Sequence, residues 1–264
     1  MARKARAEGG PRFSTAWRIA VIVALIVTLP LVALLWTLFR GSDGDEGQPS
    51  AAIIDQLSLT VPNPAFVEDA TATLQAAGYD VDYYPGEEVT VDFYRQLPFF
   101  GYDVLVFRTH ADRLQTIDDR GEAFDEVVLF TSEPYSAERY QNEQNDHDLV
   151  IARYRKGGDP FFGVAAGFIE GAGSDYDGAQ VIMMGCEGLL TDTTARAFIA
   201  RGAESYISWD ETVTASHTDA ATSALLEHLL IDGLSPAEAV AQTMAELGPD
   251  PVFGSRLLAY PPES

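Results

Sequence analysis

The chain contains a single cysteine, Cys186, at a point where an apolar run stops and a glycine-flanked turn begins: Gly178-Ala-Gln-Val-Ile-Met-Met-Gly-Cys186-Glu-Gly188. A second apolar run ends in the same way on a histidine: Gly101-Tyr-Asp-Val-Leu-Val-Phe-Arg-Thr-His110-Ala111. A thiolate is a strong nucleophile, and a nearby histidine can generate it and then protonate a leaving amine. His110 and Cys186 are therefore candidates for attack on an amide carbonyl. The backbone amides of Ala111 and Cys186 are candidate donors to the resulting oxyanion.

Both runs are too short for helices and are typical of strands buried in a parallel sheet. In such sheets, functional groups gather just beyond the carboxyl ends of the strands, so His110 and Cys186 are expected at one edge. A second interpretation of Cys186 stays open, because free cysteine is often a buried, inert apolar residue.

Strands and helices are expected to alternate along the chain, which predicts an α/β fold with a mostly parallel sheet and helices on both faces. Strands are expected at 52–55, 79–84, 103–107, 127–131 and 205–209 and in the apolar run that leads to Cys186, with a hairpin formed by 149–155 and 161–165. Helices are expected at 64–77, 91–97, 193–201, 218–231 and 235–247, and a polar helix or loop at 136–145. Asn63-Pro64 and Ser235-Pro-Ala-Glu238 are start signals for two of these helices.

The amino-terminal region predicts a membrane anchor. Residues 19–39 carry no charge and, as a helix, would be about 31 Å long, enough to cross a bilayer. Basic residues concentrate in 1–18, so that segment is expected in the cytoplasm, with an acidic linker at 40–50 and an extracytoplasmic domain at 51–264. A cleaved signal peptide is the alternative; it fits less well, because signal cores usually span about 7–15 residues.

The charge of the outer part is strongly negative. Six of the 17 basic residues and one of the 40 acidic residues lie at or before Arg40, which leaves 11 basic and 39 acidic residues and a net charge of −28. Such a surface repels nucleic acid, so no nucleic-acid partner is expected. An acid-rich, lysine-poor composition is also typical of a salt-adapted protein, since salt screens the self-repulsion. A halophilic origin is therefore the hypothesis that the composition suggests for the habitat of this protein.

The two runs and the segment that follows them resemble the caspase-like cysteine peptidase fold, in particular its CHAT and gingipain/clostripain-like branches. The matching blocks are Tyr102-Asp-Val-Leu-Val-Phe-Arg-Thr-His110, Val181-Ile-Met-Met-Gly-Cys186-Glu-Gly188, Ala197-Phe-Ile-Ala-Arg-Gly-Ala203, Tyr206-Ile-Ser-Trp209 and Ser235-Pro-Ala-Glu-Ala-Val240. The resemblance covers residues 51–247. It implies that His110 is the general base and acid and Cys186 the nucleophile. The family usually has glycine after the histidine, where this chain has Ala111.

The same resemblance implies a substrate pocket lined from the ends of the first strand and of the strand after the cysteine. Those positions hold Asp55 and Asp210, which would favour a basic side chain before the scissile bond. The alternative is that both are ordinary loop acids in an acid-rich chain.

Other chemistries lack their signatures in the sequence. We find no G-x-S-x-G elbow and no phosphate-binding G-x-x-x-x-G-K-[ST] loop, and the remaining histidines show no metal-ligand spacing. No metal and no cofactor are expected. The leading hypothesis is thus a membrane-anchored cysteine endopeptidase acting on protein or peptide substrates. The alternatives are an inactive caspase-like module that binds or senses a partner, and a membrane-tethered scaffold in which Cys186 only packs.

Overall fold

The structure, a computed structural model, describes residues 48–117 and 123–262. The segments expected at 1–18 and 19–39, and most of 40–50, lie outside the described residues. Within the described ranges, no helix is both long enough and apolar enough to cross a bilayer.

The larger sheet contains six strands among the described residues, in the order β10-β9-β8-β3-β1-β2. Its strands are β1 (Ser50–Asp55), β2 (Asp80–Pro85), β3 (Val104–Phe107), β8 (Gln180–Met183), β9 (Ser205–Trp209) and β10 (Leu257–Tyr260). All neighbours pair in parallel except β10, which runs antiparallel to β9. The central strands are short apolar runs because both of their faces are buried.

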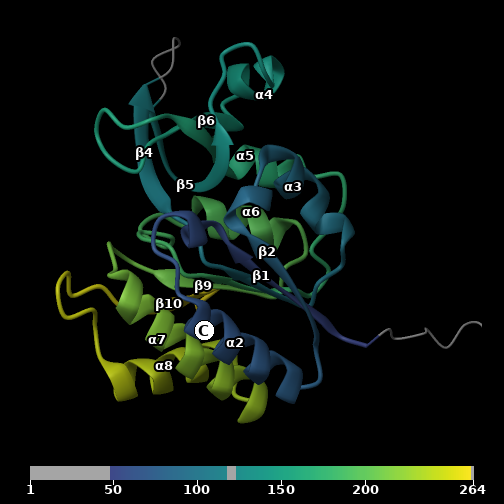
Figure 1. Cartoon of the computed structure of the whole chain (residues 1–264), viewed down its shortest axis with the longest axis vertical. Helices are drawn as coiled ribbons and strands as arrows, with labels where there is room; N and C mark the ends of the chain where they lie inside the picture. The colour runs from purple at the N-terminus through teal and green to yellow at the C-terminus, as the bar shows by residue number, and fades with distance from the viewer. Residues whose placement is uncertain (1–47, 118–122, 263–264) are drawn as a thin grey trace, which may run out of the picture. The chain divides into compact units, whose positions relative to one another are not determined.

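Helices cover both faces of this sheet (Figure 1). One face carries α2 (Pro64–Ala76), α7 (Ala215–Leu226) and α8 (Pro236–Leu247). The other carries α3 (Val91–Gln96), α5 (Ala166–Glu170) and α6 (Thr193–Ala200). The expected α/β class, with a mostly parallel sheet and helices on both faces, is confirmed. The helix expected at 218–231 begins earlier, at Ala215, and its last turn, Glu227–Ile231, is π-helical.

Two helix starts form as the sequence predicts. The Asn63 side chain accepts a hydrogen bond from the Phe66 amide, and Pro64 occupies the first turn of α2. Ser235 and Glu238 form a reciprocal capping box at the start of α8. Each cap gives a partner to amides that the helix itself leaves unsatisfied.

A second, antiparallel sheet has the order β4-β5-β7-β6. Its strands are β4 (Ala111–Ile117), β5 (Ala123–Pro134), β7 (Phe161–Val164) and β6 (Leu149–Ala152). The predicted hairpin is present as β6 and β7, with Leu149 opposite Val164. The segment 136–145 contains one short helix, α4 (Gln141–Asn145). β4, α5 and β10 are elements that the sequence did not predict.

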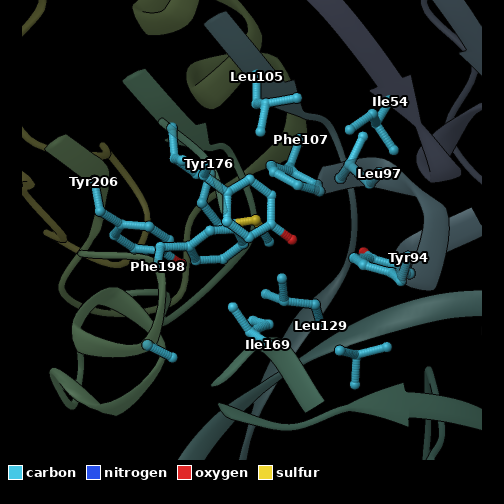
Figure 2. Close-up of a cluster of buried hydrophobic side chains, with 14 of the residues drawn as sticks. Ile54, Tyr94, Leu97, Leu105, Phe107, Leu129, Ile169, Tyr176, Phe198 and Tyr206 are labelled. Atoms are coloured by element: carbon cyan, nitrogen blue, oxygen red, sulfur yellow. The ribbon is translucent and has the colours of Figure 1, made fainter. Parts of the chain in front are cut away.

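An aromatic core lies on the α3/α5/α6 side of the main sheet and reaches the inner face of the second sheet (Figure 2). The ring of Phe198 on α6 lies 5.9 Å from that of Phe107 on β3 and 5.7 Å from that of Tyr206 on β9. Leu129 of β5 joins the same cluster. The two sheets therefore share one core, which fixes the second sheet beside the carboxyl end of β3.

Candidate functional site

His110 and Cys186 lie beyond the ends of neighbouring parallel strands. β3 and β8 pair directly, and their last residues, Phe107 and Met183, face each other in register. His110 and Cys186 are each the third residue after this pair. The sheet therefore delivers both side chains to the same edge, as expected for parallel strands.

The two residues line one cavity of about 140 Å³. Its other walls are Leu57, Val61, Thr109, Met184, Gly185, Val213, Ala215 and Thr218. A water molecule takes up roughly 30 Å³ in the liquid, so the cavity has room for a small polar group such as a peptide carbonyl. The described residues include no hydrogen bond between the His110 imidazole and the Cys186 thiol. Their side-chain partners are Thr60 and Val213 instead.

His110 is held from three sides. Its Nε2 lies 3.2 Å from the Thr60 hydroxyl, and its amide donates to Gln56 Oε1 at 3.0 Å. Its ring packs against Tyr154 with centroids 4.8 Å apart, and Gln56 also donates to the Tyr154 hydroxyl. Burial, reinforced by the positive charge of Arg108, lowers the pKa of the imidazole to about 4. The imidazole is therefore neutral at pH 7, and its protonation is disfavoured in this environment.

Cys186 is partly buried, and its thiol donates to the Val213 carbonyl at 3.5 Å. Burial raises the pKa of this thiol, and the negative charges of Glu187 and Asp112 add to the increase. The thiol is therefore protonated at pH 7. The resting pair consists of a neutral thiol and a neutral imidazole, not of the thiolate–imidazolium pair found in strongly activated cysteine nucleophiles.

The turn that carries Cys186 is tightly constrained. A Cβ at Gly185 would lie 2.5 Å from the Thr109 carbonyl oxygen, and one at Gly188 would lie 2.0 Å from the Ser208 hydroxyl. Between them, Glu187 has a φ of 62°, which is unusual for a residue with a side chain. Thr212 stabilises this conformation by donating to Glu187 Oε1 at 3.0 Å. Strained residues of this kind cluster at functional sites.

The candidate oxyanion donors are two backbone amides, that of Cys186, which lines the cavity, and that of Ala111, next to His110. Among the described residues, no backbone carbonyl accepts from the amide of Cys186, which lies beside its own sulfur. The Phe130 amide donates to the His110 carbonyl, so the next pair along the ladder, Ala111 and Leu129, is of the non-hydrogen-bonded kind. The Ala111 amide therefore points away from β5. Ala111 does not have a positive φ, so this backbone does not need the glycine that is usual at this position in caspase-like peptidases.

A buried arginine network lies beneath the cavity, and the sequence interpretation missed it. Arg108, fully buried, forms ion pairs of 2.8 Å with both Asp55 and Asp219. Its Nη2 also donates to the Val61 carbonyl at 2.9 Å. In the sequence, the only sign of this network is that Arg108 stands at the end of an apolar run, two residues before His110. The partner, Asp219, lies far along the chain in a helix whose sequence gives no sign of this role.

Asp55 and Asp210 do not line the cavity that His110 and Cys186 share. Asp55 is 1% exposed, is paired with Arg108 and borders a separate cavity of about 590 Å³ along α2. Asp210 Oδ1 accepts from the Arg256 amide at 2.7 Å, just before β10. Both carboxylates thus have structural partners, and their role in substrate recognition stays a prediction.

Within residues 48–117 and 123–262, no group of three or more His, Cys, Asp or Glu side chains is placed to hold a metal ion. No model of a known protein family matches this chain, and no curated protein sequence matches it. The class defined by the fold is therefore an α/β protein with a mostly parallel sheet, and its activity has to be argued from the site.

Proposed function

We propose that the chain is a cysteine endopeptidase of the caspase-like type, with Cys186 as nucleophile and His110 as general base and acid. One observation carries the proposal: both residues line the same cavity, each third after the register pair that ends two neighbouring parallel strands. At pH 7 the His110 imidazole is in the neutral form that a general base needs, but its pKa of about 4 makes it a weak base in the resting site, so the geometry and not the pKa carries the proposal.

The reaction would begin with transfer of the Cys186 proton to the His110 imidazole. A free thiolate is disfavoured in this pocket, so proton transfer accompanies attack of sulfur on the substrate carbonyl. The Cys186 and Ala111 amides would stabilise the oxyanion. The His110 imidazolium then protonates the leaving amine as the C–N bond breaks, which gives an acyl-enzyme. Water, deprotonated by His110, attacks the thioester, and expulsion of sulfur with return of the proton restores the pair.

The resting geometry implies that substrate binding rearranges the site. The thiol must leave the Val213 carbonyl and the imidazole must leave the Thr60 hydroxyl before the two can exchange a proton. Catalytic hydrogen bonds often tighten only when substrate is present. We further propose that residues 19–39 anchor the protein in the membrane with the domain outside the cytoplasm, on the length and apolarity of that segment.

The test is turnover by three purified variants of the full chain on a panel of peptides with basic, acidic and apolar residues before the scissile bond. Cys186→Ala and His110→Ala are each expected to abolish cleavage, whereas the control His228→Ala, in the π-helical turn after α7 and outside the cavity lining, keeps it. Circular dichroism verifies that each variant is folded. Retained cleavage by folded Cys186→Ala or His110→Ala would refute the proposal.

A second candidate function is a binding or sensing module without turnover. It is favoured by the separate partners of the two side chains and by the raised pKa of the thiol. The reaction of Cys186 with an alkylating peptide probe separates the two functions. A peptidase reacts much faster with the peptide probe than with iodoacetamide, and His110→Ala slows that reaction. A module whose thiol is inert to both reagents, but which binds an uncleaved peptide, supports the second function.

A further inference from the structure

Positive charge is scarce in the outer part of the chain and gathers in one place. Of its 11 basic residues, four line a single hollow of about 340 Å³: Arg113, Arg153, Arg155 and Lys156. We call it the basic hollow. Its walls also include Asp112 and the apolar side chains of Leu114, Val128, Phe130 and Ile151. Although the domain has a net charge of −28, this clustering makes the electrostatic potential at the hollow favourable for negatively charged groups.

The hollow lies on the face of the second sheet that points away from the shared core. Side chains alternate along a strand, so Leu129 and Phe162 face the core while Val128 and Phe130 face the hollow. At the centre of this face, β7 carries Gly163, and a Cβ there would lie 3.2 Å from Ala152 Cβ. The neighbouring side chains of Ala152, Val150 and Val128 fill the space above Gly163, and Val128 and Phe130 give the hollow an apolar floor.

Among the residues that the structure describes, three of the four cations have no ion-pair partner. Arg113 pairs with Asp125, but within the described residues no carboxylate forms a salt bridge with Arg153, Arg155 or Lys156. All three are exposed at the β6–β7 turn, in a protein with acids in large excess. Elsewhere in the described part, Arg95, Arg108, Arg139 and Arg201 each pair with one or more acids. The turn therefore presents its guanidinium and ammonium groups to solvent and not to the protein.

The basic hollow adjoins the candidate catalytic site, although the two cavities share no lining residue. Tyr154 lies in sequence between Arg153 and Arg155, and its ring packs on His110 with centroids 4.8 Å apart. Phe130 forms the floor of the hollow and lies 5.9 Å from the same imidazole. A polypeptide whose scissile carbonyl reaches Cys186 would therefore have neighbouring residues within reach of the hollow.

We propose that the basic hollow binds an acidic segment of the polypeptide substrate, next to the bond that Cys186 cleaves. That the bound polypeptide is a substrate rests on the proposed peptidase function. The binding of an acidic polypeptide in the hollow does not depend on it. Guanidinium groups recognise carboxylates with paired hydrogen bonds, and the apolar floor accepts an aliphatic or aromatic side chain within the acidic run. The ligand class is therefore a polypeptide with clustered Asp and Glu around an apolar residue.

Binding is measured by fluorescence anisotropy on full-length Cys186→Ala, so that no cleavage occurs. The probes are a labelled peptide with Asp and Glu around a central Phe, its Asn/Gln counterpart, and an RNA oligonucleotide of the same net charge as the acidic peptide. The acidic peptide is expected to bind, and more weakly at about 1 M than at about 0.1 M salt, because the screening length falls from about 10 Å to about 3 Å. Equal binding of the neutral peptide or of the RNA would overturn the proposal.

Two variants matched in charge locate the site. Arg153→Gln/Lys156→Gln is expected to weaken binding of the acidic peptide about three- to tenfold, the range for losing two exposed ion pairs. Arg196→Gln/Arg256→Gln removes the same two charges from exposed positions elsewhere and is expected to leave binding unchanged. An equal loss in both variants would show that only net charge matters and would refute the hollow as the site.

The cleavage assay separates this inference from the proposed function. If the chain cleaves peptides but Arg153→Gln/Lys156→Gln does not change kcat/KM for acidic relative to neutral peptides, the substrate role of the hollow is wrong and the peptidase stands. If the hollow binds the acidic peptide but no peptide is cleaved, the peptidase proposal fails and the hollow is the ligand site of a binding module.

Discussion

His110 combines a largely but not fully buried imidazole with a neighbouring arginine, and this combination has a consequence for stability. Its pKa is lowered to about 4 in the folded protein, whereas in the unfolded chain it is near 6.5. Between these values the unfolded chain binds a proton that the folded protein does not, so acid favours unfolding. The stabilising contribution is fully present above about pH 6.5 and is lost as the pH falls through about 4.

We therefore expect wild type to lose up to about 3 kcal/mol more unfolding free energy than His110→Gln between pH 7 and pH 4. Urea unfolding of both proteins at several pH values measures this difference. His228→Gln is a control in which the pH dependence is expected to have the opposite sign. Hydrogen bonding to Asp232 raises the pKa of His228, so its contribution is present at low pH and is lost as the pH rises. Parallel curves for wild type and His110→Gln would contradict the expectation.

At this scale, the sequence indicated the two residues that could carry chemistry but not their supports. Cys186 and His110 stand out because each is a reactive side chain at the end of an apolar run, which is a local pattern. Thr60, Val213 and Asp219 reach the site from distant loops and from a helix, and no local pattern marks them. Asp55 was noticed for its position, but the arginine that occupies its carboxylate was not.

Among the elements, the ends of β1, β3 and α7 are tied together by Arg108. It bonds Asp55 at the end of β1, Asp219 on α7 and the Val61 carbonyl in the loop before α2. Val61 and Thr218, both next to these contacts, line the cavity with His110. The network thus sets the positions of three walls of the candidate site at once.

Asp219→Asn is expected to destabilise the fold by about 3–5 kcal/mol, because it leaves a buried guanidinium with one charged partner fewer. Asp192→Asn is the matched control, since its carboxylate is exposed and lies 3.7 Å from Arg196; a change below about 0.5 kcal/mol is expected. Chemical denaturation measures both. A small effect of Asp219→Asn would mean that the network is not important for the fold.

The predicted elements were those with strong periodicity or clear caps. Buried parallel strands form apolar runs and the helices have amphipathic faces, so these appeared in the sequence. β4 did not, because Ala111-Asp-Arg-Leu-Gln-Thr-Ile117 is polar and lies at a sheet edge, where pairing with β5 and not burial defines the strand. β10 was missed because it follows the last helix and pairs antiparallel to an otherwise parallel sheet.

For the whole molecule, charge is the dominant feature. With a net charge of −28 after Arg40, self-repulsion opposes the compact state, and salt screens it. The melting temperature is therefore expected to rise with NaCl from about 0.1 M to about 1 M. Asp69→Asn/Glu87→Gln/Glu88→Gln, which removes three exposed negative charges, should melt higher at low salt and respond less to NaCl. Identical salt responses would argue against self-repulsion as the cause.

His110 also joins the two sheets. The chain leaves the parallel sheet at Phe107 and enters the antiparallel one at Ala111, and the His110 carbonyl accepts from the Phe130 amide of β5. His110 therefore lies at the junction of the two sheets, whereas Cys186 follows a strand of the main sheet alone. A small rotation of the second sheet would change the separation of the two side chains directly. A ligand that binds in the basic hollow and shifts the second sheet would thus change the distance between the His110 imidazole and the Cys186 thiol.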